Sequence, residues 1–243
     1  MQQNPSPISP EIQNQLKQLA ANTAVDTIES GMIVGLGHGS TALLAVRRLA
    51  ELLQHGKLRD ILAIPCSSFM QEEALRLGIT LTTLDEHPTI DLTIDGADEV
   101  DPELHLIKGG GGALLREKII AEASKREIII VDESKLSPKL GTKWAVPIEV
   151  VPLALTPATR HLESLGANVV LRTNSEGNPF LTDQRNFILD AHFGLIENPR
   201  ELAQKIKVRA GIVEHGLFIG IASEVIVAGV DGIRILKSSP PRA

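Results

Sequence analysis

The sequence contains no tyrosine, and aromatic residues make up only 2% of its 243 positions. Base-stacking platforms and aromatic sugar-binding grooves depend on such rings, so we expect ligands to be recognised by polar side chains and backbone groups. The single cysteine, Cys66, excludes an internal disulfide. Basic runs are missing as well: 24 Lys and Arg stand against 30 Asp and Glu, a formal net charge of −6. This balance argues against a nucleic-acid partner.

Long hydrophobic runs are also absent. No apolar stretch is long enough to span a membrane, and the polar segment from Met1 to Pro10 lacks the apolar centre of a secretory signal. We therefore expect a cytoplasmic protein with no membrane partner. The hydrophobic content of 43% over 243 residues is nevertheless enough for a substantial core in one large or two small domains.

The first half of the chain alternates short apolar runs with amphipathic stretches. Strands are predicted at 32–35, 60–64, 79–82, 90–94 and 127–131, and helices at 10–28, 42–54, 68–77 and 113–120. Such alternation is typical of a doubly wound parallel sheet, which predicts an α/β, Rossmann-like domain. Open sheets of this kind bind ligands at the carboxyl ends of their strands.

The composition changes near Gly141, where prolines begin to punctuate the chain. Strands at 146–151, 168–172, 187–192 and 216–221, with helices at 156–165 and 199–208, predict a smaller α+β domain of the split βαβ, ferredoxin-like type. We place the Rossmann-like domain at 1–142 and the small domain at 143–219, with 220–243 returning to the first sheet. The chain from Pro240 onward is predicted to be a frayed tail.

An acidic turn follows the predicted strand 90–94. It reads Asp95-Gly96-Ala97-Asp98-Glu99-Val100-Asp101. Because Gly96 permits a sharp turn, Asp95 and Asp98 can face one pocket at the edge of the sheet, where one of them would titrate abnormally.

A lysine and four glycines follow this turn. The sequence Lys108-Gly109-Gly110-Gly111-Gly112 precedes the helix that carries Glu117. A run of four glycines costs backbone entropy, which close approach to a ligand would explain. Glu117 lies among apolar residues on one helical face and is a candidate base.

Each of these pieces has an ordinary structural interpretation. An Asp-Gly pair is a common turn, a glycine run can be a plain loop, and acidic clusters often lie on a solvated rim. A divalent metal site built from Asp95, Asp98, Glu99 and Asp101 is a further alternative. We disfavour the metal site because the spacing matches no calcium loop and because Lys108 would compete for the carboxylates.

A second glycine-rich turn joins the strand 32–35 to the helix 42–54. The residues Leu36-Gly37-His38-Gly39-Ser40-Thr41 place free N–H groups and two hydroxyls at a helix start, an arrangement that suits a phosphate. The glycine spacing is not the dinucleotide fingerprint, and no Walker lysine follows. A tight turn without a ligand is the alternative.

In their order and spacing, the turn 35–41, the turn 95–99, the loop 108–111 and Arg116-Glu117-Lys118 resemble ribose-5-phosphate isomerases of the A type. The resemblance extends from the helix carrying Lys17 to the final strands. It implies interconversion of D-ribose 5-phosphate and D-ribulose 5-phosphate through an enediolate, in the non-oxidative pentose phosphate pathway. It also implies a homodimer or homotetramer with no organic cofactor and no metal. His38 departs from the family pattern, in which we expect Thr.

The resemblance also implies roles for individual residues. Glu117 matches the general base that moves a proton between C1 and C2, and Asp95 matches a carboxylate of ring opening. Asp98 and Lys108 match groups that bind the reacting hydroxyls and stabilise the enediolate. The implied substrate-binding positions are Lys17, His38, Gly39, Ser40, Thr41, Gly96, Ala97, Gly109, Gly110, Gly111 and Lys135.

The residues support the same chemistry without the resemblance. An aldose–ketose isomerase needs a carboxylate to transfer a proton, hydrogen-bond donors for the oxyanion, and a site that binds the phosphate away from the reacting carbons. The chain offers a group for each task. A non-catalytic sugar-phosphate sensor is the alternative from another class. Such a regulator would carry a DNA-reading helix pair, which we do not find before residue 31. A nucleotide-dependent oxidoreductase is disfavoured by the glycine spacing.

Overall fold

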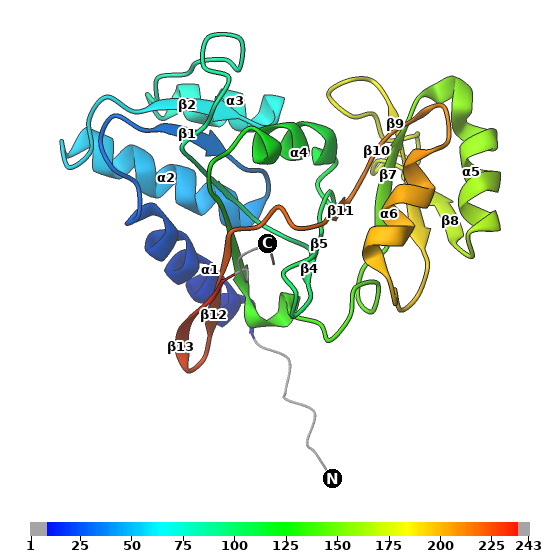
Figure 1. Ribbon diagram of the computed structural model, residues 1–243. Helices are drawn as coiled ribbons and strands as arrows, with labels where there is room; N and C mark the ends of the chain where they lie inside the picture. The colour runs from blue at the N-terminus through cyan, green and yellow to red at the C-terminus, as the bar shows by residue number, and fades with distance from the viewer. Residues whose placement is uncertain (1–8, 238–243) are drawn as a thin grey trace, which may run out of the picture.

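The structure is a computed structural model that describes residues 9–237. Its larger part is a six-stranded sheet in the order β13-β12-β6-β3-β1-β2, with helices packed around it (Figure 1). The strands are β1 (Ile33–Leu36), β2 (Leu62–Pro65), β3 (Leu92–Asp95), β6 (Glu127–Asp132), β12 (Glu224–Gly229) and β13 (Gly232–Lys237). The helices are α1 (Pro10–Val25), α2 (Ser40–Gln54), α3 (Ser68–Arg76) and α4 (Leu114–Glu122).

Every strand pair in this sheet is parallel except β12 with β13. The two faces of β6 show why helices cover both sides of the sheet. Ile128 and Ile130 belong to the core that contains α1 and α2, whereas Ile129 and Val131 pack on the other side with Ala121 of α4. A strand that is apolar on both faces must be covered on both. The predicted α/β fold is therefore confirmed.

The second part is a four-stranded antiparallel sheet in the order β10-β7-β9-β8. Its elements, β7 (Val146–Val150), α5 (Leu155–Ser164), β8 (Asn168–Leu171), β9 (Phe187–His192), α6 (Pro199–Lys207) and β10 (Ile212–His215), follow one another in a βαββαβ sequence. Figure 1 shows α5 and α6 beside this sheet, which stands apart from the larger one. This is the split βαβ arrangement that the sequence predicts. The domain limits themselves stay a prediction.

Two predicted strands were wrong. Residues 79–82 form only one bridge, between Ala63 and Leu81, so β2 is the edge of the sheet. The strand predicted at 216–221 does not complete the small sheet, because β10 does so earlier in the chain.

Instead, β11 (Leu217–Phe218) joins β5 (Leu106–Ile107) and β4 (Glu99–Val100) in a three-stranded sheet. Each of these strands has only two residues, too few to show a period of two in the sequence. The small sheet brings the acidic turn and the loop after β5 next to each other.

The carboxyl ends of three neighbouring strands define the edge where the predicted site residues gather. β1 leads into α2, β3 ends at Asp95, and β6 leads into the short helix η1 (Glu133–Lys135). A second short helix, η2 (Pro152–Ala154), precedes α5. The predicted tail from Pro240 lies outside the described residues. Over residues 9–237, no helix is both long and apolar enough to cross a membrane.

Candidate active site

The turn between β1 and α2 presents a helix start to the pocket. Gly39 is the N-cap of α2 with φ +102°, a left-handed conformation that glycine adopts without strain. The carbonyl of Gly39 accepts the N–H of Leu43, which leaves the N–H groups of the first turn for a ligand. From α1, Lys17 Nζ donates to Ser40 Oγ at 3.3 Å. A lysine therefore lies beside the predicted phosphate turn.

Lys135 reaches the same region from η1, directly after β6. Its ammonium lies 5.0 Å from the centre of the Trp144 ring, within the range of a cation–π contact. The aromatic ring does not neutralise the charge, which stays available for an anion.

Asp95 is fixed beneath the pocket. Its Oδ1 accepts the N–H groups of His38 at 3.0 Å and Gly96 at 2.7 Å, and its Oδ2 lies 2.8 Å from Lys108 Nζ. A Cβ at Gly37 would lie 2.2 Å from Asp95 Oδ1, so this position must stay without a side chain. The acidic turn and the phosphate turn are thus locked together through one carboxylate.

Lys108 joins this carboxylate to the candidate base. Its Nζ donates to the carbonyl of Gly96 at 2.5 Å and to Glu117 Oε1 at 3.3 Å. Burial lowers the pKa of Lys108, but the charges of Asp95 and Glu117 outweigh burial and raise the pKa overall. The ammonium therefore stays protonated although it is only 2% exposed.

For Glu117, burial outweighs the nearby positive charge. Burial raises its pKa to about 8, against the effect of Lys108 and with the help of Asp95 and Asp98. Its second oxygen, Oε2, is buried and accepts no hydrogen bond from the described residues. A carboxylate with one free oxygen and a pKa near neutrality is suited to accept and return a proton.

Asp98 holds the glycine loop. Its Oδ2 accepts the N–H of Gly110 at 2.7 Å, and a Cβ at Gly110 would lie 2.8 Å from Asp98 Oδ1. The close approach explains one glycine of the run, and it places the carboxylate against the backbone that leads into α4.

These groups line one cavity of about 110 Å³. The lining includes every residue that the sequence analysis placed in the site except Asp95: Lys17, His38, Gly39, Ser40, Thr41, Gly96, Ala97, Asp98, Lys108, Gly109, Gly110, Gly111, Glu117 and Lys135. Asp95 lies behind Lys108, with both oxygens occupied and 1% exposure. It shapes the cavity without forming its wall.

His38 depends on a residue that the sequence analysis missed. Its Nδ1 lies 2.9 Å from Ser67 Oγ, which also accepts the N–H of Met70 at 3.1 Å. Because the hydroxyl accepts from Met70, it can donate to Nδ1, which assigns the ring proton to Nε2. Burial lowers the pKa of His38, so the ring is a neutral donor. Ser67 before the predicted helix 68–77 signalled only a helix cap.

Glu99 has a structural role that was also missed. Its two carboxylate oxygens accept four consecutive backbone N–H groups, those of Gly141, Thr142, Lys143 and Trp144, at 3.0 to 3.2 Å. The fully buried carboxylate thus fastens the connection that leads to the small domain. Asp101 likewise accepts the N–H groups of Glu103 and His105.

The alternative metal site of Asp95, Asp98, Glu99 and Asp101 is therefore not assembled, because its carboxylates are bound to different backbone segments. Within residues 9–237, a different donor set comes together: ligand atoms of Cys66, Asp95 and Glu117 lie within 4.8 Å of one another. Lys108 Nζ already contacts both carboxylates of this set. Its ammonium takes the place of a cation, so the set does not fit a resident metal ion.

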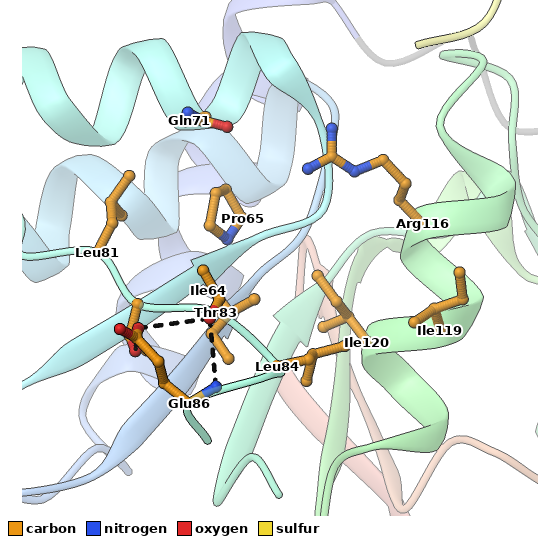
Figure 2. Close-up of a pocket in the computed structure, with 11 residues that line it drawn as sticks. Ile64, Pro65, Gln71, Leu81, Thr83, Leu84, Glu86, Arg116, Ile119 and Ile120 are labelled. Atoms are coloured by element: carbon orange, nitrogen blue, oxygen red, sulfur yellow. Dashed lines mark hydrogen bonds between the residues drawn. The ribbon is translucent and has the colours of Figure 1, made fainter. Parts of the chain in front are cut away.

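A larger cavity, of about 390 Å³, is lined from α4 by Arg116, Ile119 and Ile120 and not by Glu117 (Figure 2). Figure 2 shows Arg116, Ile119 and Ile120 on α4 at the right of the view, with Leu84 beside Ile120. Its acidic group, Glu86, is bound to Thr82 and Thr83. This cavity carries no group poised for proton transfer, so we assign the chemistry to the smaller cavity.

The chain matches a family model described as ribose 5-phosphate isomerase A (phosphoriboisomerase A) over residues 62–232. It is 57% identical to the ribose-5-phosphate isomerase A of Desulfatibacillum aliphaticivorans, covering 93% of this chain and 99% of the relative. It is 55% identical to the ribose-5-phosphate isomerase A of Chloroflexus aurantiacus, covering 92% of this chain and 93% of the relative.

Solved structures agree with these sequence matches. The ribose 5-phosphate isomerase of Plasmodium falciparum superposes with a TM-score of 0.90 at 40% identity, covering 93% of this chain and all of that chain. A D-ribose-5-phosphate isomerase in complex with phospho-erythronic acid superposes with a TM-score of 0.90 at 39% identity, covering 92% and 98%.

Proposed function

The chain belongs to the ribose 5-phosphate isomerase A family and interconverts D-ribose 5-phosphate and D-ribulose 5-phosphate in the pentose phosphate pathway, and we propose that Glu117 is the base of this reaction. One observation carries the proposal. Glu117 lines the cavity with one carboxylate oxygen unpartnered and with its pKa raised to about 8. A carboxylate of this kind is suited to general-base catalysis.

In the proposed mechanism Glu117 takes the proton from C2 of the open-chain aldose. The electron pair of that C–H bond forms the C1–C2 double bond of the enediolate, and the carbonyl oxygen at C1 takes the negative charge. Glu117 then returns the proton to C1, and the proton of the C2 hydroxyl moves to the oxygen at C1. C2 thereby becomes the ketone, and C1 becomes a hydroxymethyl group. The reaction moves hydrogen within one substrate, so it balances without an oxidant or reductant.

The other groups of the cavity orient the substrate and its charge. The ammonium of Lys108, 3.3 Å from Glu117, places a fixed positive charge beside the developing oxyanion. Asp98 accepts from a reacting hydroxyl with the oxygen that Gly110 leaves free. Asp95 was expected to serve in ring opening, which stays a prediction; its occupied oxygens favour a role in holding Lys108.

The phosphate end is bound by the turn before α2. Backbone N–H groups and hydroxyls of Ser40 and Thr41 receive the phosphate oxygens, and Lys17 and Lys135 supply the charge. Neutral His38 donates from Nε2, held in this tautomer by Ser67. This arrangement explains how a protein of formal net charge −6 attracts an anionic sugar.

Incubation of the purified protein with D-ribose 5-phosphate tests the proposal directly, with formation of the ketose as the measurement. Lys17→Ala and Lys135→Ala are expected to raise KM about tenfold or more with little change in kcat, because each removes one charge-assisted contact to the phosphate. Lys57→Ala, at an exposed position outside the cavity, is the matched control. Tight binding of the sugar phosphate without turnover would instead favour the sensor alternative.

We also propose a cytoplasmic homodimer or homotetramer. The single cysteine, which is buried and free, supports the cytoplasmic assignment, and the resemblance to the family implies the assembly. Light scattering of the purified protein distinguishes the two oligomers, and a monomeric mass that persists at assay concentration would contradict both.

A further inference from the structure

The glycine loop of the cavity is held from outside by an arginine of the small domain. Arg172 follows β8, and its Nη1 donates to the carbonyls of Gly109 at 2.9 Å and Gly110 at 3.0 Å. The guanidinium is itself fixed by Asp190 of β9, to which it donates from Nε at 2.9 Å and also from Nη2. A planar bidentate pair of this kind fixes the orientation of the guanidinium as well as its position.

The planarity of the peptide bond makes these contacts matter for the cavity. In a trans peptide unit the C=O and the following N–H point in opposite directions. Because Arg172 binds the carbonyls of Gly109 and Gly110, the N–H groups of Gly110 and Gly111 must point away from the small domain. The first of them donates to Asp98 Oδ2 at 2.7 Å, and Gly111 lies in the cavity wall. Successive N–H groups turned to one side form a site for an anion.

Neighbouring contacts hold the backbone of Arg172 and cover its side chain. Its backbone N–H donates to Ile188 O and its carbonyl accepts from Phe180 N, both at 2.9 Å. The Phe180 ring lies 5.9 Å from the guanidinium and packs so closely on Gly112 that a Cβ there would lie 2.5 Å from the ring. The side chain is 16% exposed, so water does not easily replace it.

We propose that Arg172, fixed by Asp190, is a positioning residue for the isomerisation: it holds the loop 109–111 so that the N–H of Gly110 holds Asp98 and the N–H of Gly111 faces the enediolate. The inference rests on the proposed function of the cavity. It assigns the small domain a part in catalysis that acts through the glycine loop. Charge forms at the enediolate only after the proton has left C2, so loss of these donors weakens the transition state more than substrate binding.

The test compares Arg172→Ala, Arg172→Lys and Asp190→Asn with Arg160→Ala, an exposed arginine on α5. Arg172→Ala is expected to lower kcat about 10- to 100-fold while KM for D-ribose 5-phosphate changes little, as is usual when support for a reacting group is lost. Asp190→Asn should show a smaller loss of kcat. Arg172→Lys should retain only part of the wild-type kcat, because an ammonium cannot bind both the carbonyls and Asp190. Arg160→Ala should match the wild type.

Two further readouts separate positioning from folding. Millimolar guanidinium added to Arg172→Ala should restore part of kcat. Phospho-erythronic acid, the ligand of a related structure, carries a planar carboxylate that resembles the enediolate, so its inhibition constant should weaken by the factor lost in kcat/KM.

Wild-type kcat in folded Arg172→Ala would overturn the inference. So would a rise in KM that accounts for the whole fall in kcat/KM, with no rescue by guanidinium. If Arg172→Ala does not fold, Asp190→Asn tests the inference in its place. An unchanged kcat in Asp190→Asn would contradict the proposal that Asp190 fixes Arg172 for catalysis. A wild-type protein that fails to turn over D-ribose 5-phosphate would contradict the proposed function itself, which is a separate result.

Discussion

Two buried lysines lie on either side of one phenylalanine ring, and each is paired with a glutamate that titrates differently. Lys108 Nζ lies 5.3 Å from the centre of Phe218 and Lys118 Nζ lies 4.8 Å from it. Lys118 donates to Glu214 at 2.8 Å and to the carbonyls of His215 at 2.6 Å and Leu217 at 3.0 Å. Both lysines are therefore saturated with acceptors.

The difference lies in their carboxylates. Glu214 accepts from Lys118 and Lys207, and these contacts outweigh burial and lower its pKa to about 2. Glu117 keeps one oxygen without a partner, and burial raises its pKa to about 8. The same pair of residue types thus gives a permanent ion pair in one place and a titrating group in the other. The decisive factor is whether every oxygen has a donor.

The largest expected effect is on stability, in the saturated cluster. Lys118→Met should lower the free energy of unfolding by about 3–5 kcal/mol, because it removes the donor to the buried carbonyls of His215 and Leu217 and leaves the half-buried Glu214 with Lys207 alone. The kcat per folded molecule should stay near the wild-type value. Chemical denaturation followed by circular dichroism measures the change. Lys125→Met breaks an exposed pair with Asp91 and should cost about 1 kcal/mol or less. Equal losses in the two variants would contradict the distinction.

The next effect is on activity, in the unsaturated cluster. Glu117→Gln should lower kcat about 100-fold or more, because the amide keeps the shape of the side chain and cannot accept the proton. Stability at neutral pH should not fall, since the carboxyl group is largely protonated there. The assay is ketose formation, and Glu122→Gln, exposed on the same helix, is the control. Near wild-type turnover would remove Glu117 from the base position.

A smaller effect is expected from pH. Because Glu117 must lose its proton to act, kcat/KM should rise about tenfold per pH unit up to a pKa of about 8 and then level off. The two clusters should also affect stability in opposite ways. The raised pKa of Glu117 gives a contribution that is complete below its ordinary value of 4.5 and is lost as the pH rises through about 8.

The lowered pKa of Glu214 gives a contribution that is present above 4.5 and lost as the pH falls through about 2. Unfolding free energies of Glu117→Gln and Glu214→Gln across this range separate the two. If the variants showed the same pH dependence, the two clusters would not differ as described.

The smallest effect expected is none at all. Exhaustive dialysis against a chelator should leave turnover unchanged, because Lys108 already provides the positive charge between Asp95 and Glu117. A fall in activity that magnesium reverses would show that the lysine does not fill this role.

The sequence allowed most of the site to be predicted because its signals are local. Asp95 directly follows a strand, and the glycines before Ser40 directly precede a helix, so the topology of a parallel sheet brings them to one edge. The missed features depend on partners far along the chain. Glu99 contacts backbone more than 40 residues away, at Gly141, and Arg172 contacts Gly109 at a separation of 63 residues. Periodicity tells which face a residue occupies but not what lies opposite.

The two crossings between the domains have a consequence for kinetics. Glu99 fastens the first crossing, at 141–144, and Lys118 fastens the second through the carbonyls of His215 and Leu217. Glu99 directly follows Asp98 in the chain, and Lys118 directly follows Glu117 in α4. A two-domain enzyme usually closes over its substrate by turning about such connectors. Here neither connector can act as a hinge without breaking contacts beside the reacting groups, so turnover should not wait for a gating motion.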